Sequence, residues 1–458
     1  MPVFNTWFGK SLHGWEIINV KAAPHNAVGD GATDDTAALQ SAFDVAWGPR
    51  TAPHGNNNKH ANRAVYLPPG DYRTFAPLYI TGVSGGQLFG DSAMISYVNP
   101  MNGNLWRPDG SSAGGEISPC ICMNGVAFFT MEGISMRCLS PIGAPENFGS
   151  VAIWFINAGH GGGNIATMPV FSNMEISDFQ HGIMVAYGEG PLGGGNSENG
   201  TLYSVYFNRC TGSCLMAFHA NVLNWNVIGG GATDCISEAS SGNTAAVYNA
   251  VVGCISVVAG TKLINNGRDF YVGGNMPMSV LGAYSTSLRC CKSPSPIYLN
   301  AITYKPANSA SCEFLNSSAQ STGVSGCVVD PQNNNGPGSF ATTSAGARVM
   351  IDGMIVGPGA ASMSFNGSGN DALWLRAVKP NPGQDMFANF TGKIMQYTPE
   401  ESTLYSAMPA HDKFRERTRI ISDSPVTSGV ITSGGGGNSV FTYCQGASGW
   451  RILGPVDA

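Results

Sequence analysis

Two aspartates stand beside short apolar segments, Asp234 in TDCI (233–236) and Asp269 in RDFYV (268–272). If these segments fill the same turn of successive structural repeats, the two carboxylates project from one face. Carboxylates held at a suitable separation can act as general acid and general base, which is the arrangement that cleaves glycosidic bonds. The alternative, and the commoner role for turn aspartates, is that both cap turns by accepting hydrogen bonds from nearby N–H groups.

Five further residues could contact a substrate near this pair. His181 and Arg268 fall just before the equivalent strand, where they could tune charge or hold a sugar. The long polar loop GEGPLGGGNSENG carries Glu189 and Glu198, which are the next candidate acids. Trp225 is a candidate platform for stacking a sugar ring, although packing in a core is the more frequent role of a tryptophan in an apolar run.

The 12 cysteines lie mostly in apolar runs. Neither Cys120-Ile-Cys122 nor the Cys290–Cys291 pair has the C-x-x-C spacing that is typical of zinc sites. The sequence therefore predicts reduced thiols that act as small buried hydrophobes, with no metal site and no cofactor.

The stretch from Val20 to Thr74 must position part of this scaffold. Its first half, GDGATDDTAALQ, reads as a Gly/Asp turn that runs into a helix near residues 35–46, with Thr33 and Asp34 as candidate N-caps. Its second half contains Ala64–Leu67, a β-branched and aromatic run that Pro-Pro-Gly ends, and this run predicts a strand followed by a turn.

Beyond this stretch, short apolar runs alternate with Gly, Asn and Ser and recur at roughly twenty to thirty-five residues. Such a period indicates a solenoid whose coils contribute parallel strands stacked on one another. The composition changes from residue 396, and the segment from Thr418 with its closing Gly-Trp-Arg predicts a small β-module.

The segments Gly29–Gln40 and Val65–Tyr72 resemble the opening of the pectate-lyase-like, right-handed parallel β-helix superfamily. The resemblance implies an all-β protein: a right-handed, single-stranded parallel β-helix with an N-terminal capping helix and a small C-terminal β-module. It suggests three regions, namely a cap over residues 1–77, the parallel β-helix over 78–395 and the module over 396–458. The aspartates of the motif are expected to be structural.

The net charge of −6 and the 11% of charged residues argue against nucleic acid or an anionic membrane as a partner. The N-terminus lacks a basic region followed by an apolar region, so no signal peptide is expected. No apolar run is long enough to span a bilayer.

The superfamily contains polysaccharide lyases, hydrolases, epimerases and viral tailspikes, so the fold alone does not select a function. The local signatures of polygalacturonases and of calcium pectate lyases are not found. The ending Y-C-x-G-x-x-x-W-R is similar to the endings of phage tail proteins, which favours a tailspike-like chain over the other classes.

The resulting hypothesis is a homotrimer that recognises and depolymerises a bacterial surface polysaccharide. It would be synthesised in the bacterial cytoplasm and carried on a virion tail, with the N-terminus contacting other virion proteins. Two alternatives stay open: a non-enzymatic glycan-binding adhesin or structural spike on the same fold, and a bacterial polysaccharide lyase or hydrolase.

Overall fold

The computed structural model divides the chain into two compact units, residues 1–256 with 260–262 (unit 1) and residues 257–259 with 263–458 (unit 2). The structure describes residues 16–48, 59–60, 63–99, 117–142, 149–156, 165–185, 196–217, 222–236, 246–250, 253–258, 260–274, 276–306, 312–319, 321–330, 338–343, 346–357, 363–367, 371–376, 393–397 and five strands between 418 and 455.

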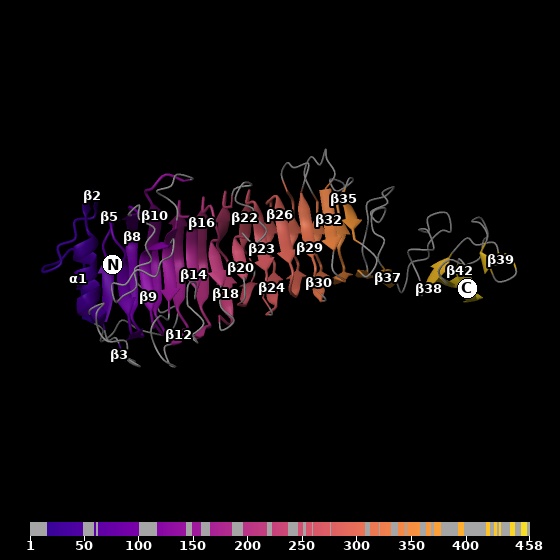
Figure 1. Cartoon of the computed structure of the whole chain (residues 1–458), viewed down its shortest axis with the longest axis horizontal. Helices are drawn as coiled ribbons and strands as arrows, with labels where there is room; N and C mark the ends of the chain where they lie inside the picture. Colours follow the sequence, from indigo (N-terminus) through magenta and orange to yellow (C-terminus); the bar gives the residue numbers. More distant parts are fainter. Residues whose placement is uncertain are drawn as a thin grey trace. The chain divides into compact units, whose positions relative to one another are not determined.

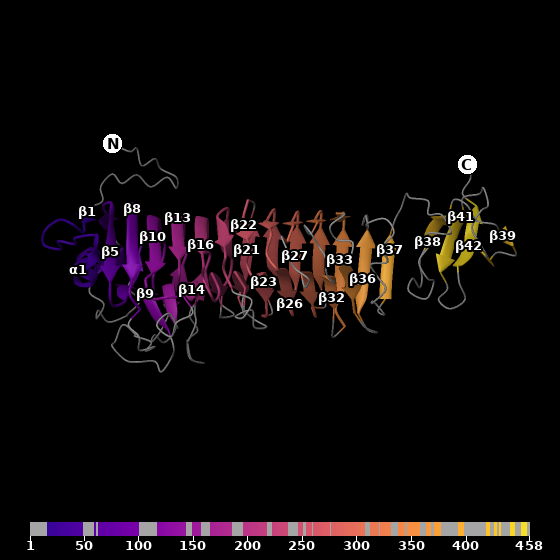
Figure 2. The same cartoon turned by 90° about the horizontal axis from the view of Figure 1, so that it is seen from above.

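Unit 1 is built from two parallel sheets. Its long sheet comprises β1 (Glu16–Asn19), β2 (Asp30–Asp34), β4 (Arg63–Leu67), β5 (Gly70–Thr74), β8 (Gln87–Tyr97), β10 (Thr130–Cys138), β13 (Val170–Ser177), β16 (Thr201–Asn208), β18 (Trp225–Ile228) and β19 (Gly231–Thr233). Its short sheet comprises β6 (Leu78–Thr81), β9 (Ser118–Asn124), β11 (Ser150–Ile156), β14 (His181–Val185), β17 (Leu215–Ala217) and β20 (Tyr248–Ala250). Two small pairs join β3 (Lys59–His60) to β7 (Val83–Ser84) and β12 (Ile165–Thr167) to β15 (Asn196–Glu198). Figure 2 shows β8, β10, β13 and β16 of the long sheet side by side.

The helix α1 (Thr36–Trp47) begins and ends within one residue of the predicted bounds. Its N-cap is Asp35, whose carboxylate accepts hydrogen bonds from the N–H groups of Val28 (2.6 Å) and Gly29 (2.9 Å) and so anchors the preceding turn. The predicted cap Asp34 is the last residue of β2, and its carboxylate accepts a hydrogen bond from the N–H of Thr36 at 2.9 Å. The Asp-rich motif is therefore held by its own backbone, as expected for a structural element.

Figure 1 shows α1 at one end of the strands of unit 1. Its buried face consists of Leu39, Ala42, Phe43 and Trp47. Gln40 attaches the helix to β6, since its side-chain amide donates to the carbonyl of Tyr79 (3.1 Å) and accepts from the Tyr79 N–H (2.8 Å). The helix thus covers apolar side chains and supplies hydrogen-bonding partners for backbone groups, which would otherwise be exposed and unpaired at this end of the sheet.

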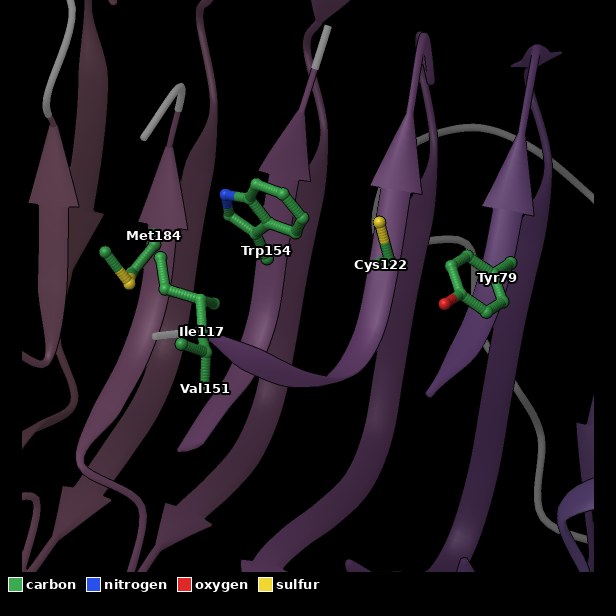
Figure 3. Packing of buried hydrophobic residues seen from close by; sticks show 6 residues of the cluster. All are labelled: Tyr79, Ile117, Cys122, Val151, Trp154 and Met184. Carbon is green, nitrogen blue, oxygen red and sulfur yellow. The ribbon is translucent and has the colours of Figure 1, made fainter. Parts of the chain in front are cut away.

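Identical register from coil to coil creates ladders of like positions. In the short sheet, Tyr79 pairs with Cys122, Cys122 with Trp154 and Trp154 with Met184, one on each of four neighbouring strands. All four are buried in one cluster (Figure 3). Burial of one such large apolar side chain contributes roughly 1.5–3 kcal/mol, so each coil is stabilised mainly by its neighbours.

The long sheet bends at one residue of every coil. Gly133, Asn173, Ser204 and Gly229 follow the registered row of Glu132, Ser172, Tyr203 and Ile228, and all four have a positive φ between 52° and 67°. A stacked left-handed residue turns each strand by the same amount, which keeps the coils superimposed.

Unit 2 repeats the same construction with shorter coils. Its long sheet contains β24 (Met278–Leu281), β25 (Tyr284–Ser285), β27 (Ile297–Asn300), β28 (Thr303–Tyr304), β30 (Thr322–Ser325), β31 (Val328–Val329), β33 (Arg348–Asp352), β34 (Ile355–Val356), β36 (Ala372–Arg376) and β37 (Lys393–Tyr397). Its short sheet contains β23 (Arg268–Val272), β26 (Arg289–Ser293), β29 (Glu313–Ser317), β32 (Gly338–Thr343) and β35 (Met363–Asn366). The strands β21 (Ile255–Val258) and β22 (Lys262–Ile264) contain residues of both units.

The last sheet is antiparallel and consists of β38 (Thr418–Ile421), β39 (Val426–Thr427), β40 (Val430–Ile431), β41 (Val440–Cys444) and β42 (Trp450–Pro455). The all-β parallel β-helix with a capping helix and a C-terminal β-module is confirmed. The region boundaries at 77 and 395 and the role of the module in trimerisation stay predictions. Within the described residues, no helix has the length and apolar character needed to cross a membrane.

Eleven of the cysteines lie in the described residues, and ten of them are buried. Their predicted place in the apolar interior is thus confirmed, with Cys254 the partly exposed exception. Cys444 lies outside the residues whose side chains are described.

Candidate functional site

The outer face of the long sheet in unit 1 carries acidic and aromatic side chains on neighbouring strands. Along β13 and β16 buried and exposed residues largely alternate, which points Glu175 and Tyr206 outward. These two residues are direct neighbours in the register, and Tyr206 is 50% exposed. Glu132 and Tyr203 flank them, each one register partner away from Ser172.

An arginine–aspartate row borders these residues. The Arg209 guanidinium donates to both carboxylate oxygens of Asp178, at 2.7 Å each. Asp178, then Asp234 and Glu175, raise the pKa of Arg209, because their negative charges favour its protonated form. Arg209 is therefore a cation that is bonded to Asp178 and is further stabilised by the charges of Asp234 and Glu175.

A second polar group lies on β5, β8 and β10 of the same sheet. Arg137 on β10 donates to the Asp71 carboxylate on β5 (2.5 Å) and to the Ser96 hydroxyl on β8 (2.8 Å). The Ser96 hydroxyl in turn hydrogen-bonds Asp71. Arg137 pairs in register with Ser177, and Ser177 with Asn208, which precedes Arg209. We call the outward residues Asp71, Glu132, Arg137, Asn173, Glu175, Asp178, Tyr203, Tyr206, Arg209 and Asp234 the polar face; the Ser96 hydroxyl is buried beneath Arg137 and Asp71.

Asp234, one of the predicted catalytic acids, belongs to this polar face. It directly follows β19, is exposed and has a positive φ of 53°. Arg209 and Asp178 occupy the same corner on the two preceding coils, with φ of 52° and 64°. The corner thus repeats a left-handed polar residue whose side chain faces solvent.

Asp269, the other predicted acid, lies in the interior of unit 2 with no exposed surface. Its carboxylate accepts hydrogen bonds from the hydroxyls of Ser285 (2.5 Å) and Ser287 (2.6 Å) and a longer one from Asn266 (3.5 Å). Burial raises the pKa of Asp269 to about 7, because desolvation disfavours the charged form more than these donors favour it.

The premise that paired Asp234 with Asp269 was wrong. Asp234 follows a strand of a long sheet, whereas Asp269 lies within β23, a strand of a short sheet, so the two positions are not equivalent points of the repeat. The catalytic role of the pair stays a prediction, but a carboxyl without exposed surface cannot touch a polymer. Asp269 therefore lies outside any surface that a polymer can contact.

Other predicted site residues have structural contacts in unit 1. His181 Nδ1 accepts a hydrogen bond from the Ser213 N–H at 3.0 Å, and burial lowers the pKa of this histidine to about 4. Trp225 is fully buried, packs edge-on against Phe155, and donates from Nε1 to the Ser197 carbonyl at 2.9 Å. These contacts account for His181 as a neutral corner residue and for Trp225 as part of the core.

The two candidate glutamates of the long loop are placed differently. Glu198 is partly buried at the end of β15, where it pairs with Thr167 of β12. Glu189 lies outside the described residues. Substrate contact by either residue stays a prediction.

Arg268 begins β23 in unit 2 and sits beside other charged residues of the short sheet. It pairs in register with Arg289, and Arg289 with Glu313, while Tyr271 pairs with Lys292. Burial lowers the pKa of both Arg268 and Lys292. The predicted role of Arg268 in tuning charge or holding a sugar stays a prediction, and this group is separate in sequence from the polar face.

Glu132, Glu175, Asp178 and Arg209 were not predicted from the sequence. The available signal was strict alternation: Asn-Met-Glu-Ile at 173–176 and Val-Tyr-Phe-Asn at 205–208 each place a polar or amphipathic residue between buried ones. Read with period two, these segments identify Glu175 and Tyr206 as outward residues of adjacent coils.

Comparison with known proteins gives a family match over the N-terminal part of the chain. Residues 17–111 match the family model described as rhamnogalacturonase A/epimerase, pectate lyase-like. No curated protein matches the chain.

Solved structures resemble the chain at low identity. The Dettilon tailspike protein is 12% identical with a TM-score of 0.47, over 93% of this chain and 78% of that one. The A-module of the Azotobacter vinelandii mannuronan C-5 epimerase AlgE6 is 13% identical with a TM-score of 0.44, over 84% of this chain and 100% of that one. The endo-xylogalacturonan hydrolase of Aspergillus tubingensis is 12% identical with a TM-score of 0.35, over 92% and 100%. The match of residues 17–111 and the observed parallel β-helix together confirm the resemblance to the pectate-lyase-like superfamily that Gly29–Gln40 and Val65–Tyr72 predicted.

Proposed function

We propose that the chain is a tailspike-like protein that binds a bacterial surface polysaccharide on the polar face of unit 1 and cleaves it there. One observation carries the proposal: the bonded pair Arg209 and Asp178 occupies the same corner as Asp234 on successive coils, and Glu175 is the register neighbour of the exposed Tyr206. Aromatic rings stack on sugars, and charged side chains hydrogen-bond their hydroxyls, so this face has the chemistry that a glycan requires.

In the proposed reaction Glu175 and Asp234 form the catalytic pair. The Glu175 carboxyl gives its proton to the glycosidic oxygen as the bond from that oxygen to the anomeric carbon breaks. The Asp234 carboxylate takes a proton from the water that attacks the anomeric carbon. Asp178 is excluded from this role, because both of its oxygens accept from Arg209 and the pair positions the guanidinium.

The test uses Glu175→Gln and Asp234→Asn with surface polysaccharides purified from a panel of bacteria. Removal of a general acid or base should slow fragment release by at least about a hundredfold while leaving binding within a few-fold of wild type. Asp352→Asn is the control, since it removes a partly exposed carboxylate of unit 2 that pairs with Arg376. Wild-type rates in both variants would show that this pair is not catalytic.

The rival function is a glycan-binding adhesin that does not cleave. The paired state of Asp178 favours it, since this carboxylate serves an ion pair rather than a reaction. If the wild-type protein binds a polysaccharide and releases no fragments, the adhesin replaces the depolymerase. Fragments with an unsaturated end would instead indicate the bacterial lyase alternative.

The proposal includes a homotrimer on a virion tail. In unit 2 the register aligns Tyr298, Gly323, Met350 and Trp374 on the outer face of the long sheet, and Tyr298 and Met350 are 42% and 58% exposed. An exposed apolar row suits burial against other copies of the chain. Attachment to other virion proteins through the N-terminus is proposed on the sequence alone, because residues 1–15 lie outside the described part.

A further inference from the structure

Three thiols meet at one point of unit 1. The Sγ atoms of Cys210, Cys214 and Cys235 all lie within 4.8 Å of one another, and all three residues are buried. Among the described residues this is the one group of three or more potential metal ligands that lie so close together. The cysteines elsewhere in the described part of the chain form no comparable group.

The fold brings these residues together from two coils. Cys210 follows Arg209 and Cys235 follows Asp234, so both occupy the same corner, and the Ile236 N–H donates to the Cys210 carbonyl at 2.7 Å. Cys214 enters from the loop that leads into β17. The spacing is C-x3-C within one corner and a third cysteine one coil later, which no local zinc motif describes.

The stacked position that Cys210 and Cys235 occupy on successive coils does not require a sulfur for packing. The corner of the preceding coil has Phe179 where the next two coils have Cys210 and Cys235, as shown by the hydrogen bonds from Asp178 N–H to the Asn208 carbonyl and from Arg209 N–H to the Thr233 carbonyl. Phe179 is fully buried there, so an ordinary apolar residue fills the position. Cys210 and Cys235 therefore put sulfur where an apolar side chain also fits, and with Cys214 beside them they call for a reason beyond core filling.

The geometry is close to that of a thiolate metal site. A zinc–sulfur bond of about 2.3 Å in a tetrahedral site places two sulfurs about 3.8 Å apart. Sulfurs already within 4.8 Å need to close by about 1 Å at most, which side-chain rotation can supply. The Cys210 N–H also donates to the Cys235 sulfur at 3.3 Å, a contact that stabilises a sulfur carrying negative charge.

We propose that Cys210, Cys214 and Cys235 bind one soft, closed-shell metal ion, Cu⁺ or Zn²⁺. Each thiol would release its proton as its sulfur binds the ion, so the bound state has three metal–sulfur bonds and no change of oxidation state. Soft thiolate ligands select these two ions over Mg²⁺ and Ca²⁺. Three sulfurs satisfy Cu⁺, whereas Zn²⁺ would require a water as fourth ligand.

The site would act as a clamp between coils. Two of its ligands, Cys210 and Cys235, directly follow Arg209 and Asp234 of the polar face, and one ion would join the corners of both coils. The site does not depend on the glycan proposal, because its evidence is the sulfur geometry alone.

The test begins with the wild-type chain, reduced and freed of metal under anaerobic conditions. Its thermal midpoint should rise when Cu⁺, supplied from a competing chelator, or Zn²⁺ is added, and elemental analysis should give about one ion per chain. Co²⁺ as a spectroscopic probe should give sulfur-to-metal charge-transfer bands. Whichever ion binds in competition with the other identifies the preferred metal.

Cys210→Ser, Cys214→Ser and Cys235→Ser should each lose the bound ion and the cobalt bands, while Cys327→Ser, a buried thiol of unit 2, should keep both. Circular dichroism establishes that each variant is folded. The proposal is overturned if folded wild type binds neither ion, if the triad variants bind as wild type does, or if thiol counting finds two of the three sulfurs joined in a disulfide.

Discussion

At the scale of single residues, Asp269 shows how a carboxyl can belong to the core. Its pKa of about 7 in the folded chain lies above the value of about 3.9 in an unfolded one. The folded state therefore holds a proton between these values that the unfolded state has lost, and stability falls as the pH rises through that window.

We expect wild type to lose on the order of 2–3 kcal/mol of unfolding free energy between pH 5 and pH 8 from this group. Asp269→Asn keeps an amide within reach of the hydroxyls of Ser285 and Ser287 and does not titrate, so its stability should change less over the same range. Denaturant unfolding of both proteins at the two pH values measures the difference. Glycan cleavage, if wild type shows it, should persist in the variant; its abolition in a folded variant would restore Asp269 as a catalytic candidate.

The predicted register of Asp269 was wrong because its strand shows no alternation of buried and exposed residues. Every residue of Arg268–Val272 is buried, so the segment has no alternation to reveal which sheet it joins. Asp234 and Asp269 were therefore matched by their apolar neighbours rather than by register. Glu175 and Tyr206, in contrast, stand in alternating segments and were within reach of sequence reasoning.

At the scale of elements, the stacked residues with positive φ at the bend of the long sheet require glycine on some coils and tolerate other residues on others. A Cβ on Gly133 would lie 2.5 Å from the Gly90 carbonyl oxygen, in addition to the strain of its φ of 67°. A Cβ on Gly326, with φ of 59°, would meet nothing within 4 Å. A substitution at Gly326 therefore tests backbone strain alone, whereas one at Gly133 tests backbone strain together with a steric clash.

Gly326→Ala should cost about 1–2 kcal/mol, the penalty for an L-residue in the left-handed region. Gly133→Ala should cost more than about 3 kcal/mol, because the neighbouring coil must also shift. Thermal or denaturant unfolding compares the two variants with wild type. Equal losses would mean that the coils at Gly133 separate without cost.

The elements were predictable where a local pattern defines them. The turn, helix and strand of residues 29–72 form one short motif whose helix was predicted to within one residue at each end. The predicted N-caps Thr33 and Asp34 were wrong, because both lie in β2 and the N-cap is Asp35. Coil register was not predictable, because the spacing between equivalent strands varies: β24, β27 and β30 begin at Met278, Ile297 and Thr322. Loops of unequal length leave the stacking of the strands unchanged, but they remove the constant sequence spacing from which the repeat could have been recognised.

At the scale of the whole molecule, the row formed by the exposed Tyr298 and Met350 and the partly exposed Trp374 predicts association of copies through unit 2. Met350→Glu would place a charge in the contact, so we expect the trimer to dissociate at concentrations where wild type holds together. Light scattering measures the mass. Met168→Glu, at an exposed methionine of unit 1, is the control and should stay trimeric.

A trimer that survives Met350→Glu would place the contact elsewhere, and the C-terminal β-module would be the next surface to test. A monomeric wild type at micromolar concentration would contradict the trimer altogether.

The bend residues with positive φ recur in unit 2 as Gly282, Ala301, Gly326 and Gly353, and they affect how the number of coils can change in evolution. The N–H of each bend residue donates to the carbonyl of the equivalent position on the next coil. Each of these coils therefore presents the same hydrogen-bonding groups to its neighbours. If the gene loses or duplicates the segment that encodes one coil, the coils on either side still present matching hydrogen-bonding groups. The length of the β-helix can therefore change by one coil at a time while the remaining coils keep their sequence.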